Sequence, residues 1–408
     1  MNSDSSHHPE HPHHPSLITH HEPPIITRAF VITCASGFVM FSSFMLLLAI
    51  LPLYLKDDLG GSDSEVGLII GVFAFAALVP RPFIGREIDR GGSKRFLIAG
   101  AIIFSISSLL YLLADSIPLL MGVRLLHGVG MACFHTAAFA FIAELAPPSR
   151  RGEAMGLWGL MSTFSTAIGP YFGLTLRDAA GVETVFIVSA VCAVAALGLI
   201  TFVREPVRER VTSTSHPGGL FEPSVLSPAI LALLFTFVYG AVQSFIILYA
   251  EERNIGRAGL YFTAFAAAVL LSRLFGGRFA DRYGRWAVIL PALAIGIASL
   301  LVLARTDTLP LLLLTGALFG LSFGAVHPAL TALAIDLVPP ARRGAGMATF
   351  TSAFELGIGS GSVLMGLVAA STSYSTMFAV CAIFPAIALV YGYSQFRVAR
   401  RIPVTVPR

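Results

Sequence analysis

Charged residues are scarce in this chain: Asp, Glu, Lys and Arg together make up 12% of its 408 residues, whereas 55% are hydrophobic. The mean hydropathy of +0.79 excludes an ordinary water-soluble domain, because such a chain needs lipid as its solvent. A hydrocarbon core of about 30 Å takes roughly 20 apolar residues of helix, so the length allows about a dozen spans. The apolar runs are continuous and do not alternate, which favours helices over a β-barrel.

Other absences narrow the function. The chain lacks a Gly-x-x-x-x-Gly-Lys-Ser/Thr loop, so we do not expect ATP to be its energy source. We expect no constellation of nucleophile or metal ligands, such as Gly-x-Ser-x-Gly or His-Glu-x-x-His, and neither enzyme activity nor a cofactor. The net charge of +4 comes from basic residues in short loops, which membrane topology explains without a nucleic-acid partner. The four cysteines all lie in apolar runs, where they act as small hydrophobes: Cys34, Cys133, Cys192 and Cys381.

Twelve apolar runs, separated by charged residues or by Gly and Pro, predict an all-α membrane protein with twelve transmembrane helices. Six spans fall within residues 28–203 and six within 226–397. A polar stretch, 204–225, is the predicted central linker. Residues 1–27 are predicted to be a disordered tail rich in His and Pro, and 398–408 a second tail. The predicted spans are 30–55, 65–84, 96–114, 118–143, 154–176, 184–203, 226–250, 258–277, 287–304, 309–335, 346–370 and 374–396.

The basic residues also predict the orientation. Lys and Arg concentrate in alternate loops, which the positive-inside rule assigns to the cytoplasm together with both chain ends. The first apolar run, Phe30 to Leu55, is too long for a cleavable signal-peptide core. We therefore expect a multi-pass, monomeric protein of the plasma membrane, such as a bacterial inner membrane.

An internal repeat is the most informative feature of the sequence. The segment from Arg81 to Arg90 reappears from Arg273 to Arg282, 192 residues later, without a gap. Two homologous six-span halves with a site between them form the architecture from which alternating access follows. The same offset relates Gly128 to Gly320, His135 to His327, Glu144 to Asp336, and Pro147–Gly152 to Pro339–Gly344.

The loop after the second span, Gly85-x-x-x-Asp89-Arg90-x-Gly92-x-Lys94, resembles the signature loop of the major facilitator superfamily. The resemblance extends over essentially the whole chain from Arg28 to Arg397. It implies two pseudo-symmetric six-helix bundles and secondary transport by alternating access. The second half carries the loop as Gly277, Asp281, Arg282 and Gly284.

The resemblance also implies roles for these loop residues. Glycine lets two helices approach closely, and the loop aspartate can face the positive N-terminus of a neighbouring helix. The loop arginine can pair with a carboxylate at the end of the fourth span or of its repeat. Glu144 and Asp336 are the candidates for that carboxylate. The whole set is expected to control the change between the two open states.

The fifth span resembles the signature of the proton-antiporter branch of the family, through Gly156, Ser165, Gly169, Pro170 and Gly173. Proline bends a helix and glycine permits tight packing, which together can set how the cavity closes. The motif favours export in exchange for protons.

Polar residues within the spans are candidates for the substrate and proton path, because an ionisable group in the membrane is costly unless it meets a partner or a cavity. Arg124 belongs to a run, Arg124-Leu-Leu-His127-Gly128-Val-Gly130, similar to a family pattern linked to proton coupling, and a structural arginine bonded to helix carbonyls is the alternative. Glu355 lies about 15 Å into its span, near the midplane. There it carries a proton, binds a cationic group of the substrate, or bonds between helices as a neutral group. The remaining candidates are His127, His135, His327 and Gln243.

Two arginines in the spans receive a different interpretation. Arg81 and Arg273 lie four residues before each loop glycine, and we expect them to extend to the cytoplasmic surface.

The sequence therefore favours a proton antiporter that exports a small organic molecule, such as a drug, sugar, siderophore or other metabolite. Proton-coupled uptake of a sugar or organic acid is one alternative. Export of a metal ion or chelate is another, because imidazole-rich tracts can bind transition metals. The tail histidines behind this alternative are His7, His8, His11, His13 and His14, with His20 and His21 further on.

Overall fold

The computed structural model describes residues 25–147, 150–205, 222–339 and 342–401, apart from the side chains at 89, 276–278, 281, 343–344 and 399–401. Every regular element in these residues is a helix, as predicted. Ten helical segments are long and apolar enough to cross a membrane by length and composition. The 30-residue α6 and the shorter apolar helix within α9 complete the twelve expected spans.

The first bundle holds six of these spans. Its second span is broken at Pro80, because proline lacks the N–H that continues a helical ladder. That span begins cleanly, with Ser62 and Glu65 forming a reciprocal capping box. The helices are α1 (Arg28–Leu53), which continues as a π-helix over Tyr54–Asp58, α2 (Asp63–Leu78), α3 (Arg81–Gly91), α4 (Lys94–Leu110), α5 (Ile117–Leu145), α6 (Arg151–Ala180) and α7 (Val182–Thr201).

The second bundle repeats this arrangement. Its last span is broken at Ala382, where Pro385 has no N–H for the carbonyl of Cys381, and it runs on to Arg401, past the predicted boundary at 397. Most of the predicted linker and most of each predicted tail lie outside the described residues. The helices are α8 (Leu226–Glu252), α9 (Leu260–Tyr283), α10 (Trp286–Leu303), α11 (Leu309–Leu337), α12 (Arg343–Ser371), α13 (Tyr374–Cys381) and α14 (Ile383–Arg401).

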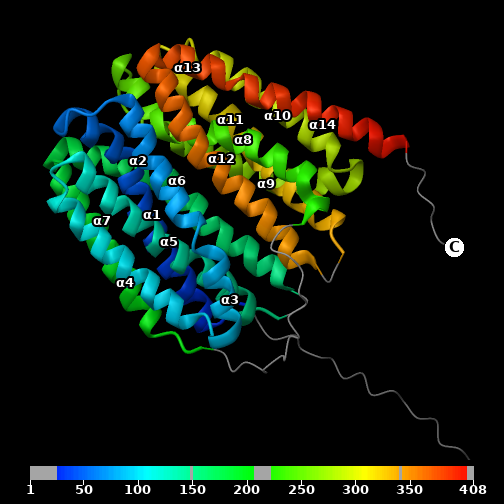
Figure 1. Cartoon of the computed structure of the whole chain (residues 1–408), viewed down its shortest axis with the longest axis horizontal. Helices are drawn as coiled ribbons and strands as arrows, with labels where there is room; N and C mark the ends of the chain where they lie inside the picture. The colour runs from blue at the N-terminus through cyan, green and yellow to red at the C-terminus, as the bar shows by residue number, and fades with distance from the viewer. Residues whose placement is uncertain (1–24, 148–149, 206–221, 340–341, 402–408) are drawn as a thin grey trace, which may run out of the picture.

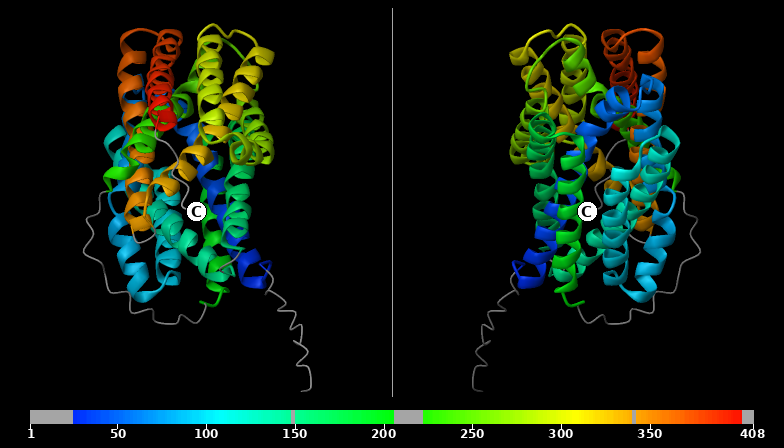
Figure 2. Two further views of the ribbon diagram at one scale, coloured as in Figure 1. Left: turned by 90° about the vertical axis from the view of Figure 1, so that its right-hand side faces the viewer. Right: turned by 90° about the vertical axis from the view of Figure 1, so that its left-hand side faces the viewer.

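The two bundles lie side by side. Figure 1 shows α1 to α7 grouped on one side of a diagonal and α8 to α14 on the other. Figure 2 shows both flanks, with most of the yellow-to-red helices in the upper part and most of the blue-to-green helices in the lower part. Within the first bundle α1 packs on α6 and α7, and within the second α11 packs on α9 and α10.

Equivalent glycines pack in the same way in both bundles. A Cβ on Gly128 would lie 2.6 Å from the carbonyl oxygen of Phe73, and a Cβ on Gly320 would collide with the carbonyl oxygen of Phe265. All of these residues are related by the 192-residue offset. A side chain at either glycine would force apart the two helices that meet there. The two halves of the chain therefore share their helix packing as well as their sequence.

Successive spans run in opposite directions, so the loops alternate between two sides. We call the side with both chain ends and the loops at 92–93 and 284–285 the terminal side. The side with the loops at 59–62 and 253–259 is called the opposite side. The basic residues predict that the terminal side is cytoplasmic, and this orientation remains a prediction.

Candidate functional site

The interface between the bundles, which we call the seam, has two equivalent strips. In one strip α2 and the start of α3 face α12, and in the other α9 faces α6. Because α2 and α3 correspond to α9, and α6 corresponds to α12, the strips are related by the sequence repeat.

The seam is closed on the opposite side. The Tyr374 hydroxyl donates to the Asp63 carboxylate at 2.5 Å, and Arg177 forms an ion pair with Glu251 at 3.1 Å. Both contacts join the first bundle to the second. A solute therefore cannot pass between the bundles at this end without breaking charged contacts.

The helices also approach closely just below these contacts. A Cβ on Gly71 of α2 would lie 3.0 Å from the carbonyl oxygen of Gly359 of α12. In the other strip a Cβ on Gly259, the N-cap residue of α9, would lie 2.6 Å from the Cα of Tyr171 of α6. Glycine is required in both strips because the backbones are nearly in contact.

Two arginines cross the seam deeper in the molecule. Nη1 of Arg81 lies 2.7 Å from Oε1 of Glu355, and the side chains are 21% and 18% exposed. Nη1 of Arg273 donates to the hydroxyl of Thr163 at 3.2 Å and to the carbonyl oxygen of Gly159 at 3.5 Å. The expectation that both arginines extend to the membrane surface is wrong, because each finds its polar partner on the other bundle.

The terminal side is open at the seam. Gly156 and Ala348 lie seven residues before Thr163 and Glu355, about 700° of rotation and thus on the same helix faces. A Cβ on Gly156 would meet nothing within 4 Å, and Ala348 is exposed. Among the described residues, no hydrogen bond or ion pair crosses the seam beyond the two arginines toward this side. The structure is therefore open to the terminal side and closed to the opposite side.

His135 and His327 flank the arginines symmetrically. His135 packs against Phe41, and the charge of Arg81 acts on its imidazole. His327 stacks on Phe323 with ring centroids 5.8 Å apart, and Arg273 is its charged neighbour. Neither imidazole has a hydrogen-bond partner among the residues that the structure describes, so their ring nitrogens are available for a solute or water.

Arg124 and His127 lie inside the first bundle. Arg124 is fully buried, donates from Nε to the carbonyl oxygen of Ile69 at 3.3 Å and stacks 4.3 Å above the ring of Phe73. His127 is also buried and shares a 2.8 Å hydrogen bond with the Tyr111 hydroxyl. These contacts match the alternative of an arginine that bonds a neighbouring helix, although both terminal guanidinium nitrogens lack partners among the described residues.

Gln243 lies within the second bundle, where its amide bonds the Tyr239 hydroxyl at 2.5 Å. The gap beside them is too narrow to admit water and is lined by Tyr261, Phe265 and other apolar side chains. Gln243 thus fixes Tyr239 in this state instead of facing an open path.

The loop motif forms different pairs from those expected. Arg90 pairs with Glu87 at 3.0 Å, while Glu144 accepts a hydrogen bond from Ser93 at 3.2 Å. A Cβ on Gly85 would meet nothing within 4 Å, so close helix approach does not require glycine there in this state. The loop arginine therefore pairs within its own segment, because Glu87 is three residues away on the same helix.

The second loop also forms pairs that differ from those expected. Asp336 lies 3.5 Å from Arg285, whereas the guanidinium of Arg282 lies over the ring of Tyr283. Gly92 and Gly284 both adopt φ +90°, a conformation that only glycine takes readily. The backbone of Lys94 bonds Glu205. The side chains of Asp89 and Asp281, together with the expected role of Gly277, lie outside the described part.

The antiporter-like motif packs α6 onto α1. A Cβ on Gly169 would lie 2.5 Å from Cβ of Met45, and one on Gly173 would lie 3.0 Å from the carbonyl oxygen of Leu46. Ser165 also reaches α1, through a 3.0 Å bond to the carbonyl oxygen of Phe38. Pro170 lies inside the helix between the two glycines. Gly156 takes no part in this packing.

The expectation that the chain has no Gly-x-Ser-x-Gly run is wrong, because one extends from Gly320 to Gly324. It lies in the middle of α11, not on a strand-to-helix turn. Ser322 is fully buried and donates to the carbonyl oxygen of Ala292 at 2.6 Å. Its hydroxyl therefore serves helix packing and is not presented as a nucleophile.

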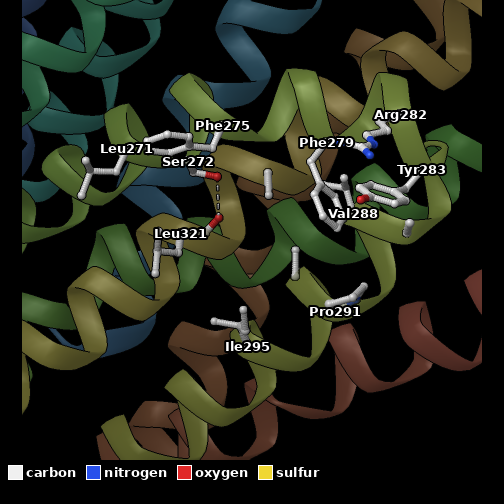
Figure 3. A pocket seen from close by; sticks show the side chains of 13 residues that line it. Leu271, Ser272, Phe275, Phe279, Arg282, Tyr283, Val288, Pro291, Ile295 and Leu321 are labelled. Atoms are coloured by element: carbon white, nitrogen blue, oxygen red, sulfur yellow. Dashed lines mark hydrogen bonds between the residues drawn. The ribbon is translucent and has the colours of Figure 1, made fainter.

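An apolar groove of the second bundle lies away from the seam. Figure 3 shows it between α9 and α10, with Leu271, Phe275 and Ile295 along its walls. Leu271 and Phe275 are each two residues from Arg273, about 200° around α9, and so face away from α6. Such a surface suits lipid chains and offers little to a polar solute. No group of three or more metal-binding side chains occurs among the described residues, and the tail histidines lie outside them.

Two homologous bundles that meet at a seam, closed on one side and open on the other, define a carrier of the alternating-access type. The sequence matches the Major Facilitator Superfamily over residues 33–261 and 255–403. The chain belongs to this family of secondary transporters, as its loop motifs indicate.

Relatives and solved structures agree with this assignment. An uncharacterized MFS-type transporter of Burkholderia mallei (strain SAVP1) is 29% identical over 370 residues, which cover 88% of this chain and 89% of the relative. A mutant of the nucleoside transporter NupG has a TM-score of 0.77 at 14% identity, covering 90% of this chain and 100% of that one. An inward-facing bacterial homolog of the human lysosomal transporter Spinster has a TM-score of 0.76 at 17% identity, covering 92% and 98%. The two structural likenesses concern the fold alone.

Proposed function

We propose that the chain is a proton-coupled antiporter that exports a small organic molecule, with Glu355 as the carboxylate that binds and releases the proton. The observation that carries the proposal is the ion pair between Arg81 and Glu355 across the seam. Protonation removes the charge of Glu355 and hence the attraction between the bundles at this level. Proton binding is thereby linked to the change between the two open states.

The direction of transport rests on the fifth span. Gly169 and Gly173 pack directly on α1, and this close packing supports an antiporter-like role for the span. With the terminal side cytoplasmic, the observed state is open to the cell interior, from which an exporter takes its substrate. Uptake of an organic acid with a proton is the second candidate, and it is favoured by Arg273, a cation at the seam without a carboxylate partner in the described part.

Reconstituted vesicles test the proposal. In Glu355→Gln, a pH gradient is expected no longer to drive accumulation of the transported molecule. Exchange of the labelled for the unlabelled molecule without a gradient should persist. Glu153→Gln, which breaks an exposed pair with Arg150 at the start of α6, is the matched control and should keep both activities. Gradient-driven accumulation that survives in Glu355→Gln would remove Glu355 from the coupling, and the sign of the driving gradient separates antiport from symport.

A further inference from the structure

The two seam arginines are equivalent in the repeat, but their partners are not. Arg273 follows Arg81 by 192 residues, and Glu355 follows Thr163 by the same number. The structure therefore places two equivalent pairs across the seam, one arginine against a carboxylate and the other against a hydroxyl. No described carboxylate lies within ion-pair distance of Arg273.

The unused donors of Arg273 define the missing partner. Both of its hydrogen bonds leave from Nη1, so Nε and Nη2 have no partner among the described residues. A guanidinium presents its donors in a planar fork that matches the two oxygens of an anionic group. The side chain is partly buried between α9 and α6, where an unpaired charge is costly.

The surroundings of Arg273 admit an anion. Its close partners are a hydroxyl and a carbonyl oxygen, and its neighbours His327 and Tyr239 carry further polar hydrogens. The seam is open from the terminal side up to this level, because Gly156 on the same face of α6 borders empty space. An anionic solute can thus enter from that side.

We propose that Arg273 binds the anionic group of the transported molecule, a carboxylate, sulfonate or phosphate, at the place that corresponds to the carboxylate of Glu355 in the other strip. The inference rests on the proposed function in treating the bound molecule as the transported one. The bound anion and Glu355 then neutralise one arginine each.

Binding to the purified full-length protein in phosphatidylcholine nanodiscs tests this site. The probes are benzoate, benzenesulfonate and phenyl phosphate, with neutral benzyl alcohol as the control. At least one anion is expected to raise the midpoint of thermal unfolding in a saturable manner, by a few degrees at about 100 times its Kd. Arg273→Gln should abolish the shift, and Arg273→Lys should weaken binding about tenfold or more, because it lacks the fork.

Thr163 provides the sharper variant. Thr163→Glu supplies a carboxylate at the position equivalent to Glu355, and should raise the unfolding midpoint without ligand and abolish the response to anions. Thr163→Gln introduces an uncharged side chain of similar size, and the unfolding midpoint of this variant should still rise when anions are added. The proposal would be overturned if Thr163→Glu or Arg273→Gln bound anions as well as the parent protein does. It would also be overturned if no anion raised the unfolding midpoint of the parent protein.

Two further results distinguish the solute site from a lipid site, and the anion site from the proton-coupling role of Glu355. Stabilisation through Arg273 by phosphatidylglycerol in the nanodisc, without any response to soluble anions, would mark a lipid site and overturn the proposal. These measurements need no pH gradient, so they are independent of the flux assay on Glu355→Gln. Anion binding combined with normal gradient-driven flux in that variant would refute the proton-coupling role and leave the anion site standing.

Discussion

Removal of the ion pair between Arg81 and Glu355 should shift the balance between the two open states. At 2.7 Å and an effective dielectric constant of about 20, the Coulomb attraction is about 6 kcal/mol. Both side chains are about four-fifths buried, and the cost of their desolvation offsets much of this attraction. We expect Arg81→Gln to disfavour the observed state by about 1–3 kcal/mol, or about 5–150-fold in the equilibrium.

Single cysteines report this shift after the four native ones are replaced. Thr263→Cys lies in the closed part of the seam, where the threonine hydroxyl bonds the carbonyl oxygen of Ala167 at 2.6 Å. Its reaction with an impermeant maleimide should accelerate about 5–150-fold in Arg81→Gln, whereas Gly156→Cys on the open side should react more slowly.

Two controls define the interpretation. The exchanged pair Arg81→Glu with Glu355→Arg should restore the parent rates, and Glu153→Gln should leave them unchanged, because its pair is exposed and worth a few tenths of a kcal/mol. Equal rates in Arg81→Gln and the parent protein would show that the pair does not hold the seam.

Two further predictions concern packing and closure. Gly128→Val and Gly320→Val should each lower the free energy of unfolding by about 1–3 kcal/mol, because their side chains collide with equivalent backbone oxygens, whereas Gly85→Ala should leave thermal unfolding nearly unchanged. Tyr374→Phe removes the hydrogen bond to Asp63, worth about 1.5–3 kcal/mol for a charged acceptor, and should speed labelling of Thr263→Cys by tenfold or more; an unchanged rate would show that this bond does not contribute to closure.

The spans and the repeat were predictable because both leave marks along the chain. Apolar runs define the helices, and a single offset defines the two bundles. The breaks at Pro80 and Ala382 were missed, although proline near each break gives a local signal. Helix periodicity does not show them, because the flanking residues stay apolar.

The seam contacts were not predictable from local pattern. Arg81 and Glu355 are far apart in the chain, and only the meeting of α3 with α12 brings them together. Thr163 carries no motif of its own, yet its equivalence to Glu355 through the 192-residue offset was available in the sequence. The loop arginines were assigned the wrong partners, because Glu87 competes locally with the more distant Glu144 for Arg90.

The central claim is that the two bundles open and close in alternation about the seam. Distances between spin labels test it most directly, with one pair at Gly156→Cys and Ala348→Cys on the terminal side. The second pair, Asp178→Cys and Glu252→Cys, uses exposed positions beside the Arg177–Glu251 contact on the opposite side. Glu355→Gln, which removes the charge that pairs with Arg81, should shorten the first distance and lengthen the second relative to the parent protein. Distances that change in the same direction, or that do not change at all, would contradict the account.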